Sequence, residues 1–224
     1  MRLIRFAWAI SICLLAAGGA LWSTKPQAAE TWTFDSVERI GGYSTHVLGD
    51  PQVIQGPAGK AVQFNGAGDA IFLDVHPLAG AAMFTWEVIF RPDLGGRPEQ
   101  RFFHLQEQGT ETRMLMEIRT IGGQWFLDSF VMSGRESRTL FNKEHLHPLG
   151  EWYHVATVYD GRELSNYVNG MKENAALAHL EPQGPGRSSI GVRINLRDYF
   201  KGAVARARMT RRALSPKEFM PIRP

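Results

Sequence analysis

The chain has 224 residues, with 25 Lys and Arg against 22 Asp and Glu, and only one cysteine. A single cysteine excludes a disulfide framework. The length suits one domain with a sizeable hydrophobic core, and one folded domain is therefore expected.

The first 29 residues have the layout of a secretory signal peptide. Arg2 and Arg5 form a basic start, Phe6–Leu21 is apolar, and small residues follow at positions 17–20 and 28–29. This order is typical of a cleaved export signal, so we expect a mature domain over residues 30–224 that is secreted, extracellular or periplasmic. The alternative is a retained membrane anchor, although the apolar run is shorter than the roughly 20 residues that span a bilayer.

Removal of residues 1–29 would change the charge of the chain. It takes away Cys13 and three of the 25 basic residues, which leaves 22 basic against 22 acidic side chains. Such a balance argues against a nucleic-acid partner. Ten Lys and Arg still fall within residues 187–224, against Asp198 and Glu218. They indicate either a patch for an acidic partner or the solvated side of the last strands.

Turn signals separate short apolar runs throughout residues 30–224. Gly-Gly and Gly-Pro pairs recur, for example at 41–42, 56–57, 95–96, 122–123 and 184–186. Residues 152–170 contain two runs of aromatic and β-branched side chains, and Asp160-Gly161 and Asn169-Gly170 supply the tight turns. We predict a β-hairpin here and an all-β fold, a two-sheet antiparallel β-sandwich of the jelly-roll type.

Period-2 alternation separates the two faces of several strands. In residues 113–119, Met114, Met116 and Ile118 share one face, which leaves two arginines and Glu117 on the other. If all such strands lie in one sheet, the same reasoning assigns one set of charged and polar residues to its outer face. This set comprises Glu87, Arg91, His104, Arg113, Glu117, Arg119, Asp128, Arg193 and Asn195. Asp128 is included although aromatic residues fall on both faces of its strand.

The predicted hairpin also carries a family resemblance. Its sequence, W-Y-H-V-A-T-V-Y-D-G…Y-V-N-G, resembles the central hairpin of laminin-G-like domains in the concanavalin A-like lectin/glucanase superfamily. Three further segments resemble the family in the same order, at residues 59–69, 84–92 and 200–219. The resemblance covers roughly residues 31–220 and implies the jelly roll, a fold that hosts lectins, binding modules and enzymes alike.

The resemblance also implies a ligand, because glycans commonly lie on the concave sheet face in this superfamily. We expect the nine outer-face residues to bind a polysaccharide, with arginine forks that suit carboxylate or sulfate groups. Two alternatives remain. The charges could form cross-strand salt bridges without a ligand, at ~0.2–1 kcal/mol per pair, or the domain could bind a protein at a cell surface.

An enzyme acting on polysaccharides is the other class that the sequence leaves open. Glu87, Glu117 and Asp128 could supply the two carboxylates of a hydrolase, but the E-x-D-x-x-E run of the glucanase branch is missing from the sequence. Residues 113–119, His104 and Tyr199-Phe200-Lys201 loosely resemble the strands of alginate-lyase jelly rolls. A lyase would use their Arg, His and Tyr side chains. No catalytic residue is assigned.

Metal binding is not expected, with Ca²⁺ as the alternative. The resemblance implies an early and a late acidic ligand, and Asp35 matches the early one. Ala205-Arg206 stands where the late acidic pair belongs, and a cation in place of a ligand weakens such a site. Among the histidines, His154 is predicted to make a structural hydrogen bond, and the His145-x-His147 pair to pack in a loop.

Overall fold

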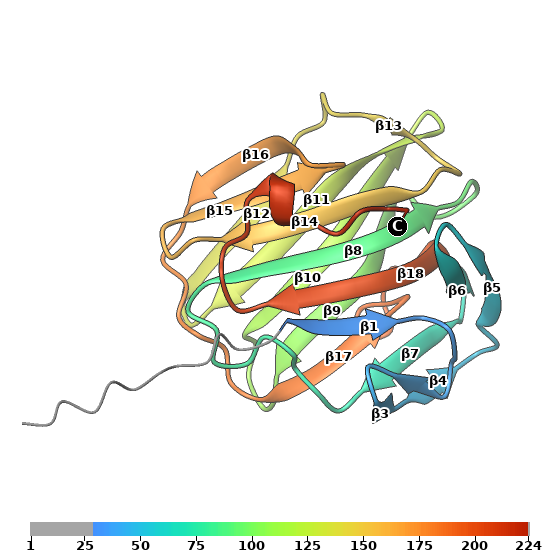
Figure 1. Ribbon diagram of the computed structural model, residues 1–224, viewed down its shortest axis with the longest axis horizontal. Coiled ribbons are helices and arrows are strands. Elements are labelled where there is room, and N and C mark those ends of the chain that lie inside the picture. Colours follow the sequence, from blue (N-terminus) through green and yellow to red (C-terminus); the bar gives the residue numbers. More distant parts are fainter. Residues whose placement is uncertain (1–28, 224) are drawn as a thin grey trace, which may run out of the picture.

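The computed structural model describes residues 29–223, which form two stacked antiparallel sheets (Figure 1). The sheet nearer the viewer in Figure 1, here called the front sheet, has the order β16-β15-β14-β8-β18-β6-β5, with β1 beside β18. Its strands are β1 (Glu30–Thr33), β5 (Gln52–Gly56), β6 (Gly59–Asn65), β8 (Phe84–Pro92), β14 (Tyr153–Tyr159), β15 (Glu163–Val168), β16 (Met171–Leu177) and β18 (Lys201–Thr210).

The back sheet lies behind it, in the order β12-β11-β10-β9-β17-β7-β4, with β13 beside β11. Its strands are β4 (His46–Leu48), β7 (Ala70–Leu73), β9 (Glu99–Glu107), β10 (Arg113–Ile121), β11 (Gln124–Ser133), β12 (Glu136–Phe141), β13 (His147–Pro148) and β17 (Gly186–Ile190). A small ribbon pairs β2 (Arg39–Ile40) with β3 (Tyr43–Ser44), and one 3₁₀ turn, η1, covers Pro216–Glu218. The predicted all-β sandwich is confirmed.

Aromatic side chains from both sheets fill the space between them. Phe90 of the front sheet stacks on Phe102 of the back sheet, with ring centroids 4.4 Å apart, and meets Trp125 edge-on at 5.2 Å. These side chains are all but inaccessible to solvent. Burial of such large apolar surfaces is the main force that holds two sheets together.

The predicted hairpin is present as β14 and β15. The Asp160 carboxylate accepts hydrogen bonds from the backbone N–H groups of Arg162 and Glu163, which closes the first turn. Asn169 and Gly170 both have positive φ angles, 49° and 78°, in the second turn. Two successive residues with φ > 0 are typical of a type I′ hairpin turn, so the Asn-Gly prediction is also confirmed.

A β-bulge in β9 changes which residues face outward. The pairing of β9 with β10 shifts between Met116, which pairs with Phe103, and Glu117, which pairs with Arg101. Phe102 is the extra residue, and both Phe102 and Phe103 are fully buried. As a result, Arg101 and His104 both point outward, although simple alternation would place them on opposite faces of the strand.

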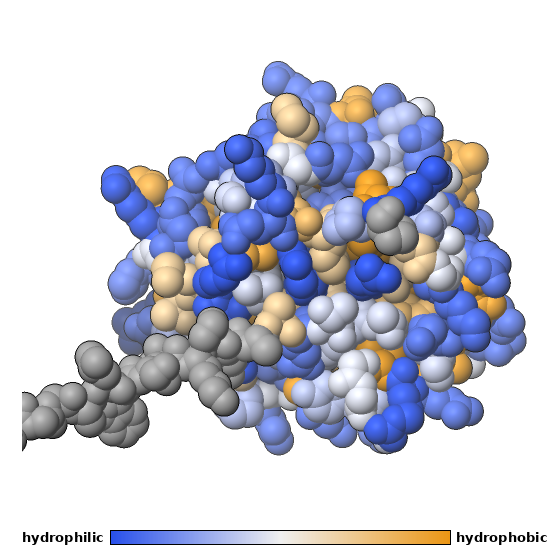
Figure 2. Space-filling model, in the orientation of Figure 1, coloured by the Kyte–Doolittle hydropathy of each residue, from blue (hydrophilic) through white to orange (hydrophobic). Residues whose placement is uncertain are grey.

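The C-terminal segment crosses the outer face of the front sheet, and η1 lies in front of β14 (Figure 1). The Phe219 ring packs 5.3 Å from the ring of His154 and 5.2 Å from that of Tyr167. Figure 2 shows hydrophilic side chains over most of this face, with apolar ones in small patches. The outer face of the front sheet is therefore partly covered by the chain itself.

The signal-peptide prediction falls on residues that lie, except for Ala29, outside the described part of the chain. Within residues 29–223, no helix has the length and apolar character needed to cross a bilayer.

Candidate functional site

Glu87 does not belong to the predicted charged face. It lies on β8 in the front sheet, whereas His104 and Arg113 lie in the back sheet. Its fully buried carboxylate accepts hydrogen bonds from Arg208 Nε at 2.6 Å, His154 Nε2 at 3.0 Å and the backbone N–H of Met220 at 2.7 Å. Burial works to raise the pKa of Glu87, but these hydrogen bonds outweigh it and lower the pKa. Glu87 thus fastens the C-terminal segment, and the predicted structural role of His154 is confirmed.

Arg91 is the second incorrect assignment, for the same reason. It also lies on β8, where its Nε donates to Asp93 at 2.7 Å and its guanidinium stacks over the Trp152 ring at 5.3 Å. Alternation predicted correctly that Glu87 and Arg91 point away from the core. It could not say from which of the two sheets they point.

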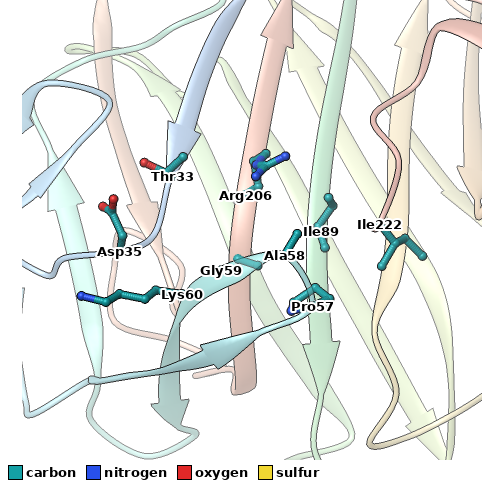
Figure 3. Close-up of a pocket in the computed structure, with 10 residues that line it drawn as sticks. Thr33, Asp35, Pro57, Ala58, Gly59, Lys60, Ile89, Arg206 and Ile222 are labelled. Atoms are coloured by element: carbon teal, nitrogen blue, oxygen red, sulfur yellow. The ribbon is translucent and has the colours of Figure 1, made fainter. Parts of the chain in front are cut away.

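Asp35 lines a pocket of about 160 Å³ on the outer face of the front sheet (Figure 3). Asp35 and Lys60 lie on one side of it, Ile89 and Ile222 on the other, and Arg206 between them. Two cations and one carboxylate do not fit a Ca²⁺ ion, which needs several oxygen ligands. Across residues 29–223, no three His, Cys, Asp or Glu side chains gather as a metal site would require.

The His145-x-His147 pair has the predicted packing role at its second member. His147 Nε2 lies 2.6 Å from Glu173 Oε1, and its ring packs 4.9 Å from Trp125. His145 is exposed in the preceding loop.

The outer face of the back sheet brings together five of the predicted residues. Glu117 of β10 is paired with Asp128 of β11, and Leu115 of β10 is paired with His104 of β9. Arg113 and Arg119 lie on the same outward face of β10 as Glu117. The loop after β17 adds Arg193, because the backbone N–H of Ile194 donates to His104 Nδ1 at 3.0 Å. Asn195, also predicted, is exposed on this loop.

Arginines and carboxylates form a dense network at one end of this face. Arg101 bonds Glu117 at 2.9 Å and Glu99 at 3.2 Å, and it also pairs with Asp198. Arg119 Nε bonds Asp128 at 2.8 Å, its Nη2 lies 3.8 Å from Glu117, and it pairs with Glu99. The cross-strand salt-bridge alternative therefore describes this part of the face. Arg101 was missed because the bulge at Phe102 reverses the alternation.

The fold disfavours the charged forms of the two central carboxylates, Glu117 and Asp128. Burial raises the pKa of Glu117, and the charge of Asp128 adds to that effect against the opposing Arg101. Burial likewise raises the pKa of Asp128 despite its bond from Arg119. Asp128 Oδ1 is buried and has no hydrogen-bond partner within the described protein. Unsatisfied buried acceptors are rare in folded proteins, so this oxygen marks Asp128 as a candidate contact for a ligand.

Asp128 lines a groove of about 440 Å³, which we call the groove. It runs over the ends of β9 to β12 and is bordered by Glu99, Arg119, Phe126, Asp128, Thr139, Phe141 and Lys143, among others. Phe141 is 49% exposed, and its ring lies 6.3 Å from that of Phe126 beneath it. Sequence reasoning missed these two rings, although aromatic residues on both faces of residues 124–131 were a signal.

A second group lies toward the other end of the face, and we call it the cationic cluster. It consists of His104, Arg113, Arg187 and Arg193. Arg113 and Arg187 flank Gln106 in register on either side of β9. Burial, with the charges of Arg193, Arg113 and Arg187, lowers the pKa of His104 to about 3. The His104 ring is therefore uncharged at neutral pH.

Comparison with known proteins agrees with this architecture. The sequence model of a laminin G family, described as concanavalin A-like lectin/glucanases superfamily, matches residues 65–219. The chain belongs to the concanavalin A-like lectin/glucanase superfamily. The match includes the hairpin of β14 and β15 and the whole of the cationic cluster, so the resemblance inferred from the sequence is confirmed. No curated protein matches the sequence of this chain.

Solved structures similar to the domain include several binding domains. Domain 4 of a GH43 extracellular arabinanase from Geobacillus stearothermophilus, in complex with arabinotriose, has 18% identity and a TM-score of 0.62; the match covers 84% of this chain and 94% of that one. The receptor binding domain of botulinum neurotoxin D has 13% identity and a TM-score of 0.62, and the match covers 84% of this chain but 50% of that one. A SAP-like pentraxin from Limulus polyphemus follows at 16% identity and a TM-score of 0.54, with 70% and 77% covered. At such identities the likeness establishes the fold.

Proposed function

We propose that this domain binds a polysaccharide on the outer face of the back sheet, with the groove as the main contact. One observation carries the proposal: Asp128, whose buried Oδ1 has no hydrogen-bond partner among the described residues, borders a groove that also holds an exposed aromatic ring, Phe141. Sugars present hydroxyl donors at their edges and apolar C–H groups on their faces, and this pair of features matches both.

The remaining groove residues extend the same chemistry. Arg119 and Lys143 border the groove and can donate to ring and hydroxyl oxygens, and Thr139 can donate or accept. Lys143 lies 6.0 Å from the Phe141 ring, so a cation and a stacking surface lie side by side. A few convergent polar groups beside an aromatic surface are typical of a small-molecule or glycan site.

The arabinanase domain supports a glycan rather than another ligand, since it was solved with arabinotriose. The similarity to toxin receptor binding domains supports the alternative, in which the partner is a protein. We also propose that the protein is secreted, extracellular or periplasmic, a location where it would meet polysaccharides directly.

The test is affinity electrophoresis of residues 30–224 against neutral and acidic polysaccharides, with arabinan among the neutral ones. Phe141→Ala should weaken retention by about tenfold, in line with an aromatic contact worth roughly 1 kcal/mol or more. Leu94→Ala, at a side chain that is 65% exposed and outside the groove, is the matched control and should bind as wild type does. Equal binding by wild type and Phe141→Ala would show that the groove is not the main contact for the polysaccharide.

A second candidate, glycoside hydrolysis, is favoured by the Glu117 and Asp128 pair. These residues are direct register partners, so their Cβ atoms lie about 4.5–5.5 Å apart, and burial raises the pKa of both. Release of reducing ends from any bound polysaccharide, lost in Glu117→Gln, would make the domain a hydrolase. Retention without new ends would leave it a binding module.

A lyase receives less support. His104 Nδ1 already accepts a hydrogen bond from Ile194, so the neutral ring carries its hydrogen on Nε2 and has no free lone pair to take a proton. Absorbance at 235 nm, which reports unsaturated ends, should therefore stay flat.

A further inference from the structure

The cationic cluster contains two buried hydrogen-bond donors that the protein leaves unused. Because His104 Nδ1 accepts from the Ile194 N–H, the Nε2 atom of the neutral ring carries the hydrogen. That Nε2 and Arg113 Nε are both buried and have no partner among the described residues. Leaving a buried donor unpaired costs about 1–3 kcal/mol, so both atoms call for an acceptor.

The positive charge of the cluster is also poorly compensated. In the part of the chain that the structure describes, neither Arg187 nor Arg193 forms an ion pair, and Arg113 pairs only with Glu111, whose side chain is 82% exposed. Burial, followed by the charge of Arg193, lowers the pKa of Arg113. The guanidinium also stacks 4.8 Å over the Phe130 ring, which fixes its orientation.

The network at the groove end shows the opposite balance. There, Arg101 and Arg119 face four carboxylates, those of Glu99, Glu117, Asp128 and Asp198. An anion would be repelled at that end and attracted at the cationic cluster. The face is thus divided into an acceptor-rich end and a donor-rich end.

We propose that the cationic cluster is a subsite for the anionic group of an acidic sugar, a carboxylate or a sulfate, on the same glycan that occupies the groove. His104 Nε2–H and the Arg113 fork donate to its oxygens, and Arg187 and Arg193 supply charge. Arg113 and Arg119 stand six residues apart on β10, which spans ~20 Å. A single sugar is too short to reach both ends, so the ligand is an oligosaccharide. This inference rests on the proposed function.

The first experiment uses isothermal titration calorimetry to compare a neutral oligosaccharide that ends in one galacturonate with the methyl ester of the same oligosaccharide. The two share one backbone and differ at a single carboxyl group, which is a charged carboxylate in one and a neutral methyl ester in the other. Wild type should bind the acid at least about tenfold more tightly, the equivalent of one charge-assisted hydrogen bond. Arg113→Gln/Arg193→Gln should abolish this preference, because it lowers the affinity for the acid far more than the affinity for the ester. A neutral oligosaccharide with one terminal sulfate, compared with its unsulfated form, is the second arm and distinguishes sulfate from carboxylate.

Two variants serve as controls. Arg162→Gln/Lys217→Gln removes the same charge at exposed positions away from the back-sheet face and should keep the preference. Arg113→Lys/Arg193→Lys keeps the charge but lacks the guanidinium fork, and it should restore only part of the preference for the acid. The subsite is wrong if the Gln double variant prefers the acid as strongly as wild type, or if wild type has no preference in either arm.

A second measurement does not depend on the groove. Inorganic sulfate and free galacturonate are titrated separately, and the imidazole ¹H–¹⁵N signals of His104 are followed. Saturable shifts in wild type, absent from Arg113→Gln/Arg193→Gln, support the subsite even if Phe141→Ala binds glycans normally and the groove proposal fails. Unmoved His104 signals with both anions would overturn the subsite and leave the groove proposal standing.

Discussion

The two sheets each bury carboxylates among arginines, and they do so in opposite ways. On the front sheet, one carboxylate, Glu87, receives hydrogen bonds from Arg208, His154 and the Met220 backbone, and its pKa falls. On the back sheet, Glu117 and Asp128 share two arginines with further carboxylates, and their pKa values rise. The front arrangement is saturated and holds a segment of the chain. The back arrangement keeps an unpaired oxygen beside a groove, so the difference separates a structural ion cluster from a candidate binding surface.

The largest expected effect is at Glu87. Glu87→Gln leaves the partly buried Arg208 without its counter-charge, and breaking a buried pair typically costs about 3–5 kcal/mol. The free energy of unfolding, measured with urea, should fall by that amount. Glu151→Gln, at an exposed position, should change little. A loss below about 1 kcal/mol, the range of exposed pairs, would mean that the front cluster is not structural.

The next effect is the acid sensitivity that His104 imposes. Its pKa is about 3 in the folded protein and 6.5 when unperturbed, so below pH 6.5 the unfolded chain takes up a proton that the folded one refuses. The free energy of unfolding should then drop by about 1.4 kcal/mol per pH unit between these values. Urea titrations from pH 7 to 4 should show a shallower slope for His104→Gln. The exposed His46→Gln variant should keep the wild-type slope.

The smallest effect is at Glu117. Arg101 keeps Glu99 and Asp198 when Glu117 is replaced, and the charged form of Glu117 opposes folding because its folded pKa is raised. Glu117→Gln should therefore change the free energy of unfolding by less than about 1 kcal/mol, far less than Glu87→Gln. Wild type should also gain stability as the pH falls through the raised pKa, and the variant should lose that gain. Equal costs for Glu87→Gln and Glu117→Gln would erase the contrast between the sheets.

Part of the candidate site followed from the sequence. Alternation in residues 113–119 identified Arg113, Glu117 and Arg119 as one outward row, and the structure agrees. It failed at Arg101, because the bulge at Phe102 adds a residue and reverses the faces beyond it. It also gave no access to Phe141, whose exposure depends on the neighbouring β11.

The amino-acid sequence was sufficient to predict the fold class, the central hairpin and the core-facing side of several regular strands. These are local properties: side chains alternate every residue, and Asp-Gly or Asn-Gly fixes a turn wherever it occurs. The tertiary structure was needed to place Glu87 and Arg91 on the front sheet and the other charged strands on the back sheet. Strand order is set by pairing between distant segments, such as β8 with β14 and β18. No local pattern encodes this choice of sheet. It distinguishes the outer face of the front sheet, which the C-terminal segment partly covers, from the outer face of the back sheet, which holds the groove.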